Sequence, residues 1–168
     1  MFRFPALEAF ATRFADAFSR DSRPLTDEER SSAIEVFGDA LDLEPIRLVR
    51  ASIVNSPTTL GNVIRTPLEG EIDRVTLIHE LAHVWQYQTR GAAYISDSAW
   101  HQAGATLTTG SRHAAYELTP ADLAAASIHD LPAEKQAVVV ERWFADPFLR
   151  EHPGYRRFLA EVRQPNTS

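Results

Sequence analysis

The sequence predicts a mainly helical α+β domain with one small sheet. Several segments carry apolar residues three and four positions apart, which is the spacing of an amphipathic helix. Only residues 46–53 and 61–66 combine β-branched side chains with flanking turn signals, as short strands do. The chain has 168 residues, of which 44% are hydrophobic, so it can bury a core, and we expect a single domain over 1–168.

Two helices are predicted before the strands. Residues 5–19 repeat apolar side chains at helical spacing. The next helix begins after Thr26, because Thr26 and Glu29 have the spacing of a capping box, in which each side chain bonds to the other residue's backbone N–H. Apolar residues continue at helical spacing as far as Leu41, and we expect Pro45 to end this helix.

The two strands follow directly. Residues 46–53 are rich in β-branched side chains and predict the first strand. A turn around 55–57 leads to the second strand, residues 61–66. Two short strands with little else predict a small sheet, which we expect to be antiparallel.

Residues 71–89 form the longest predicted helix. One flank is lined by Leu77, Leu81 and Val84, and the other by Ile78, Ala82 and Trp85. His79 and His83 lie on the polar stripe between these flanks, with Gln86 or Tyr87 continuing it. A helix that is apolar on both flanks of a polar stripe is typical of a buried position.

The remainder of the chain predicts loops and then short helices. Residues 91–112 are rich in Gly, Ser and Thr and predict loops with one short helix. Thr119 is expected to cap a helix that has Pro120 at its first position. Further helices are expected over 132–145 and from Pro153 onward.

The central helix contains the motif His79-Glu80-x-x-His83. Two histidines four residues apart lie on one helical face, so both imidazoles can reach a single Zn²⁺ at ~2.0–2.1 Å. Glu80 can stand beside a metal-bound water as general base. A surface helix that happens to carry two histidines is the simpler interpretation. Against it, the helix is too apolar to be exposed, and burying unpartnered imidazoles beside a carboxylate would be costly.

A catalytic zinc site needs a third protein ligand and leaves the fourth position for water. The candidates after the motif are Glu117, Asp122, Glu134, Glu141, His101, His113 and His129. Glu134 and Glu141 share one face of a strongly apolar helix, where inward carboxylates need a partner. We assign Glu134 as the ligand and Glu141 as a group that orients a ligand histidine, with Glu141 also the alternative ligand. A glutamate in a first helical turn also complements the helix dipole without any metal.

A metallopeptidase would also need a hydrogen-bond donor for the developing oxyanion. Tyr116 and His113 are the expected catalytic candidates, with Tyr87 and Tyr155 as further possibilities. Each of these residues is more often a packing aromatic or a surface polar group.

Composition excludes several classes of function. The net charge is −6 without a basic patch, so no nucleic-acid partner is expected. No apolar run approaches the ~20 residues that span a bilayer, and the first residues do not resemble a signal peptide. The chain has no cysteine, so a metal must use imidazole, carboxylate and water. We expect a cytoplasmic protein, or one exported without a signal peptide.

The stretches 76–88 and 134–141, together with 60–64 and 115–118, resemble a family of bacterial zinc-peptidase-like domains. Members of that family occur beside Rhs- and Vgr-type secretion proteins and contractile injection systems. The resemblance covers residues 36–145 and is specific around the two helices. Where relatives often have Glu-Gln-Gln-Ala, this chain has Glu134-Lys135-Gln136-Ala137, which keeps the ligand position.

The resemblance implies a zincin-like fold of the gluzincin type, in which His79, His83 and Glu134 hold zinc. It also implies a zinc metallopeptidase that cleaves a peptide or protein substrate, with a possible partner in a secretion system. The alternative is a non-catalytic zinc-binding adaptor or interaction module of that system. Glu80 argues against the adaptor, because a purely structural site has no use for a base. A third possibility is a self-processing or toxin-like protease delivered to other cells.

Overall fold

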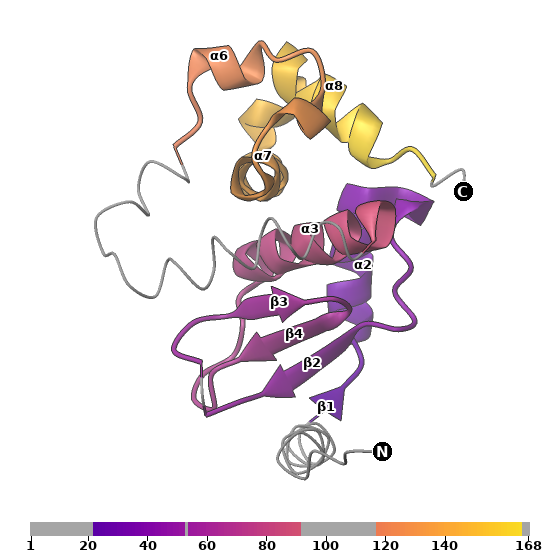
Figure 1. Ribbon diagram of the computed structural model, residues 1–168, viewed down its shortest axis with the longest axis vertical. Helices are drawn as coiled ribbons and strands as arrows, with labels where there is room; N and C mark the ends of the chain where they lie inside the picture. The colour runs from indigo at the N-terminus through magenta and orange to yellow at the C-terminus, as the bar shows by residue number, and fades with distance from the viewer. Residues whose placement is uncertain (1–21, 53, 92–116, 166–168) are drawn as a thin grey trace, which may run out of the picture.

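The computed structural model describes residues 22–52, 54–91 and 117–165, and its architecture is α+β and mainly helical, as predicted (Figure 1). The helix predicted over 5–19 lies outside the described residues, as does all but the first residue of the loop region predicted over 91–112. Among the described residues, no helix is both long enough and apolar enough to cross a bilayer.

The central element is helix α3, Arg74–Arg90, which lies between the sheet and helix α7, Ala133–Ala145 (Figure 1). Helix α2, Asp27–Phe37, packs against α3, and helix α8, Pro153–Val162, packs against both α7 and α2. The arrangement places α3 in contact with the sheet on one side and with α7 on the other. The middle of α3 is therefore enclosed between the sheet and α7.

The sheet has four strands in the order β1-β2-β4-β3, and it is mixed. The strands are β1 Ser22–Arg23, β2 Arg47–Arg50, β3 Thr58–Leu60 and β4 Val63–Thr66. The prediction of an antiparallel pair was wrong, because the two expected strands, β2 and β4, run parallel. The unpredicted strand β3 lies between them in sequence and pairs antiparallel with β4, so the chain reverses twice. Gly61, with φ +62°, makes the turn from β3 to β4.

The capping box before α2 is confirmed. Thr26 Oγ1 accepts from the Glu29 N–H at 3.3 Å, and Glu29 Oε2 accepts from the Thr26 N–H at 2.8 Å. The predicted end at Pro45 was wrong, because the helix stops at Phe37. Gly38 has φ +56°, a left-handed conformation that breaks the helix and leads into the short 3₁₀ turn η1, Gly38–Ala40.

Helix α3 is buried on all sides over its middle, as the sequence predicts. It begins after Asp73, whose side chain accepts from the Thr76 N–H, and it ends at Gly91. Residues Leu77 to Gln86 are all buried, His79, Glu80 and His83 among them. A helix with so much buried apolar surface is stabilised mainly by packing against its neighbours and less by the helix propensity of its residues.

The helices expected after residue 117 are also confirmed. Thr119 caps α6, Pro120–Leu123, with Pro120 at the first position. The 3₁₀ turn η2, Ile128–Asp130, leads to α7, and the turn η3, Pro147–Glu151, leads to α8. The contact between α7 and α3 is the main helix–helix interface, and it brings the two candidate ligand segments together.

Candidate metal centre

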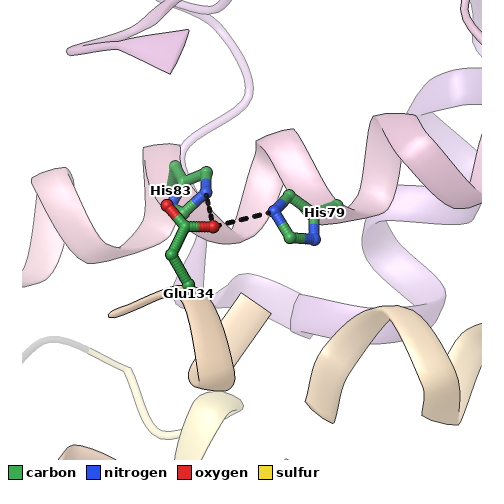
Figure 2. A group of neighbouring side chains, drawn as sticks. All are labelled: His79, His83 and Glu134. Carbon is green, nitrogen blue, oxygen red and sulfur yellow. Dashed lines mark ion pairs between the residues drawn. The ribbon is translucent and has the colours of Figure 1, made fainter. Parts of the chain in front are cut away.

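The candidate ligands come from two helices that pack across each other. His79 and His83 lie one turn apart on α3, and Glu134 lies in the first turn of α7. Figure 2 shows the Glu134 carboxylate pointing between the two imidazoles. Both histidines are buried, with 8% and 4% of their surfaces exposed. The three side chains form a group that could hold a metal ion.

The distances within this group fit a tetrahedral metal ion. Glu134 Oε2 lies 3.4 Å from His79 Nε2 and 3.5 Å from His83 Nε2. Bonds of ~2.0–2.2 Å to a tetrahedral zinc ion would place its ligand atoms ~3.3–3.6 Å apart. Glu134 Oε2 is also buried without a hydrogen-bond partner among the described residues. The two imidazoles face this oxygen at ion-pair distance, and a cation at the centre of the group would bind it more closely.

The ionisable side chains of this group shift one another's pKa values. Burial alone would lower the pKa of His79, but Glu134 and Glu141 outweigh it and raise the pKa to about 9. The pKa of His83 is also raised, mainly by Glu134 acting against burial. Burial would raise the pKa of the Glu134 carboxyl, yet the two imidazoles lower it. The carboxylates around the two imidazoles therefore favour positive charge at this position, which a divalent cation would also supply.

A second carboxylate holds His79 from the opposite ring nitrogen. Glu141 Oε2 lies 2.8 Å from His79 Nδ1, and Glu141 is two helical turns after Glu134 on the same face of α7. An imidazole that donates Nδ1–H to a carboxylate presents its other nitrogen to a metal and becomes a stronger ligand. The structure therefore places Glu141 where we expect an orienting group and Glu134 where we expect a ligand.

His83 has an amide partner instead. Gln86 Oε1 lies 2.9 Å from His83 Nδ1. The sequence places Gln86 on the same stripe as the histidines, but it does not indicate this contact. Spacing of three residues on one helix is the signal that could have found it.

Glu80 faces the sheet and is anchored there. Its carboxylate accepts from the Thr59 hydroxyl, with 2.6 Å between Thr59 Oγ1 and Glu80 Oε2. Glu80 is 7% exposed, and its negative charge helps to raise the pKa of both His79 and His83, so it lies close to the ligand group. Thr59 belongs to the unpredicted strand β3, and its contact with Glu80 was therefore not predicted.

Several other candidates lie elsewhere. Asp122 pairs with Lys135, and His129 lies against Arg90. Tyr155 is a buried core residue on α8, and the ring of Tyr87 lies near Gly61. The two expected oxyanion donors, Tyr116 and His113, lie outside the described residues, as does His101.

Comparison with known proteins gives one structural match of interest. The solved structure titled "Effector domain of Pseudomonas aeruginosa VgrG2b" matches with a TM-score of 0.56 and 25% sequence identity, over 91% of this chain and 90% of that chain. No protein-family model and no curated protein sequence matches the chain. The match agrees with the predicted association with Vgr-type proteins. The zincin-like and gluzincin assignments stay predictions.

Proposed function

We propose that this protein is a zinc-dependent hydrolase, most simply a metallopeptidase, in which His79, His83 and Glu134 hold the metal. The observation that carries the proposal is the buried Glu134 oxygen between two imidazoles, without a hydrogen bond among the described residues. Two imidazole nitrogens and one carboxylate oxygen are a donor set that suits zinc and leaves a position open.

The residues around the ligands have separable tasks. When bound, zinc supplies a Lewis acid that acidifies water and polarises a carbonyl oxygen. Glu141 and the amide of Gln86 each hold one histidine by its Nδ1, so that both Nε2 atoms face Glu134. Neutral imidazoles and one carboxylate leave net positive charge at the centre, which stabilises a developing oxyanion.

Glu80 is the proposed general base. In this proposal its carboxylate takes a proton from the attacking water and later delivers that proton to the leaving amine. Thr59 donates to Oε2, so we assign Oε1 as the oxygen that takes the proton. A base held in one orientation needs no reorganisation when the water is deprotonated.

The proposed biological setting is that of an effector. The matched structure is described as an effector domain of VgrG2b, and the match extends over nearly all of both chains. On that support we propose that the chain acts as an effector associated with a Vgr-type protein, with a peptide or protein substrate.

The direct test is hydrolysis of a quenched fluorescent peptide library of mixed sequence by the zinc-loaded protein. We expect cleavage that a chelator abolishes and that added zinc restores. A protein that binds zinc tightly but cleaves neither peptides nor unfolded proteins would contradict the peptidase. That result would favour the alternative, a zinc-binding adaptor of a secretion system.

Replacing Thr59 with valine should slow hydrolysis by about tenfold, the lower end of the effect expected for a group that orients a site residue. Valine has nearly the shape of threonine and suits a strand, so only the hydroxyl bond to Glu80 is lost. We expect kcat to fall while KM and zinc affinity stay unchanged. Thr59→Ser keeps the hydroxyl and should restore the rate. Equal rates for the valine variant and the wild type would show that Thr59 does not position the base.

A further inference from the structure

A buried pair of glutamines links the histidine helix to the start of α7. Gln86 on α3 and Gln136 on α7 are each 1% exposed. Gln86 Nε2 lies 2.9 Å from the Ala133 carbonyl oxygen and 3.0 Å from Gln136 Oε1. Gln136 Nε2 in turn lies 2.7 Å from the Leu131 carbonyl oxygen. The pair therefore links His83 to two backbone carbonyls, those of Leu131 and Ala133, at the start of the helix that carries Glu134.

The two backbone carbonyls fix the direction of this whole chain of hydrogen bonds. A carbonyl oxygen can only accept, so the amide nitrogen of Gln136 must face Leu131 and that of Gln86 must face Ala133. The amide oxygen of Gln86 is then left for His83 Nδ1, at 2.9 Å. An amide oxygen also only accepts, so Nδ1 of His83 must carry a proton. Its Nε2, which lies 3.5 Å from Glu134 Oε2, is the nitrogen left to bind a metal.

The same network ties the start of α7 to α3. The residue before the helix is Pro132, which makes no side-chain capping hydrogen bond. Gln86 reaches the carbonyl of Ala133, the residue directly before Glu134, from the other helix. The position of the carboxylate ligand is thus tied to the helix that carries both histidines.

We propose that Gln86 is a positioning residue for the metal centre, which sets the His83 tautomer and fixes the first turn of α7 through Ala133 and Gln136. This inference rests on the proposed metal site. It assigns to Gln86 the role of arranging the ligands before a metal ion binds. Buried amides are costly unless their bonds are satisfied, and leucine would fill the same space in an apolar core. These hydrogen bonds reach one ligand, His83, and the residue before another ligand, Glu134. Packing alone would not require hydrogen bonds at these two positions.

The test compares Gln86→Leu with Gln88→Leu in the full chain. Gln88 is a matched control because it lies on the same helix but bonds to Asp42 and Asn62, away from the ligands. Zinc affinity is measured by competition with a chromophoric chelator. We expect Gln86→Leu to bind zinc about 10–100-fold more weakly than the wild type, and Gln88→Leu to be unchanged. Equal affinity in the two variants would overturn the inference.

A second readout does not depend on metal binding. The ring nitrogens of His83, labelled with ¹⁵N, report the tautomer in the metal-free protein at alkaline pH, where the ring is neutral. We expect the proton on Nδ1 in the wild type and in Gln86→Glu, which keeps an acceptor for His83, and a shift of the proton toward Nε2 in Gln86→Leu, which removes that acceptor. If the leucine variant does not fold, the wild type and Gln86→Glu still test the tautomer. A proton on Nε2 in the wild type would contradict the inference. If the wild type binds no zinc, the proposed function fails, yet this measurement still decides whether Gln86 sets the tautomer.

Discussion

Glu80→Gln is expected to abolish hydrolysis while leaving both the fold and the metal in place. Glutamine has the shape of glutamate and can still accept from the Thr59 hydroxyl, so the buried environment of the side chain is kept. It cannot take a proton from water. General-base catalysis contributes ~10²–10⁴-fold, and we expect kcat to fall by at least that amount. The measurement is single-turnover cleavage of a peptide identified in the library screen, at saturating zinc.

The control for Glu80→Gln is the zinc content of the same preparation. Glu80 is not one of the three grouped ligands, so the variant should bind zinc as the wild type does. A variant that has lost its zinc would show only that the site was damaged. Undiminished cleavage by a zinc-loaded variant would remove Glu80 from the mechanism and would leave the metal site without its base.

Zinc removal is expected to cost the folded protein several kcal/mol. A ligand that binds only the folded state stabilises it by RT ln(1 + [L]/Kd), which is about 4 kcal/mol at a free concentration ~1,000 times Kd. The effect should be large here because the ligands come from α3 and α7, which only folding brings together. The measurement is denaturant unfolding in a zinc buffer, followed by the same experiment with chelator.

Glu134→Gln is the matched control for zinc-linked stability. It keeps the shape of the third ligand and removes the charge that holds the two imidazoles. We expect its free energy of unfolding to be independent of zinc. If zinc stabilises the variant and the wild type equally, the ion binds somewhere other than between α3 and α7.

The parts of the site that the sequence predicted are those set by local spacing. The motif predicted two histidines on one face, and the structure places both Nε2 atoms around one oxygen of Glu134. The apolar pattern of 71–89 predicted a buried helix, which is confirmed. The capping signals at Thr26 and Thr119 gave helix starts correctly, because a cap is an interaction between residues three positions apart.

The parts that the sequence did not predict depend on contacts between distant residues. Thr59 bonds to Glu80 across 21 positions, and Gln86 bonds to Gln136 across 50. Neither contact produces a periodic pattern in the local sequence. The parallel pairing of β2 and β4 was missed for the same reason, since β3 has only three residues and too short a pattern to recognise.

The central claim is that His79, His83 and Glu134 hold one zinc ion, and elemental analysis tests it most directly. The purified chain is incubated with zinc, dialysed, and analysed by mass spectrometry beside three variants, His79→Ala, Glu134→Ala and Glu141→Ala. The variant of an exposed glutamate, Glu69→Ala, serves as the control. We predict one zinc ion per chain in the wild type, the control and Glu141→Ala, and none in His79→Ala or Glu134→Ala. A wild type without zinc, or a Glu134→Ala variant that keeps it fully, would contradict the account.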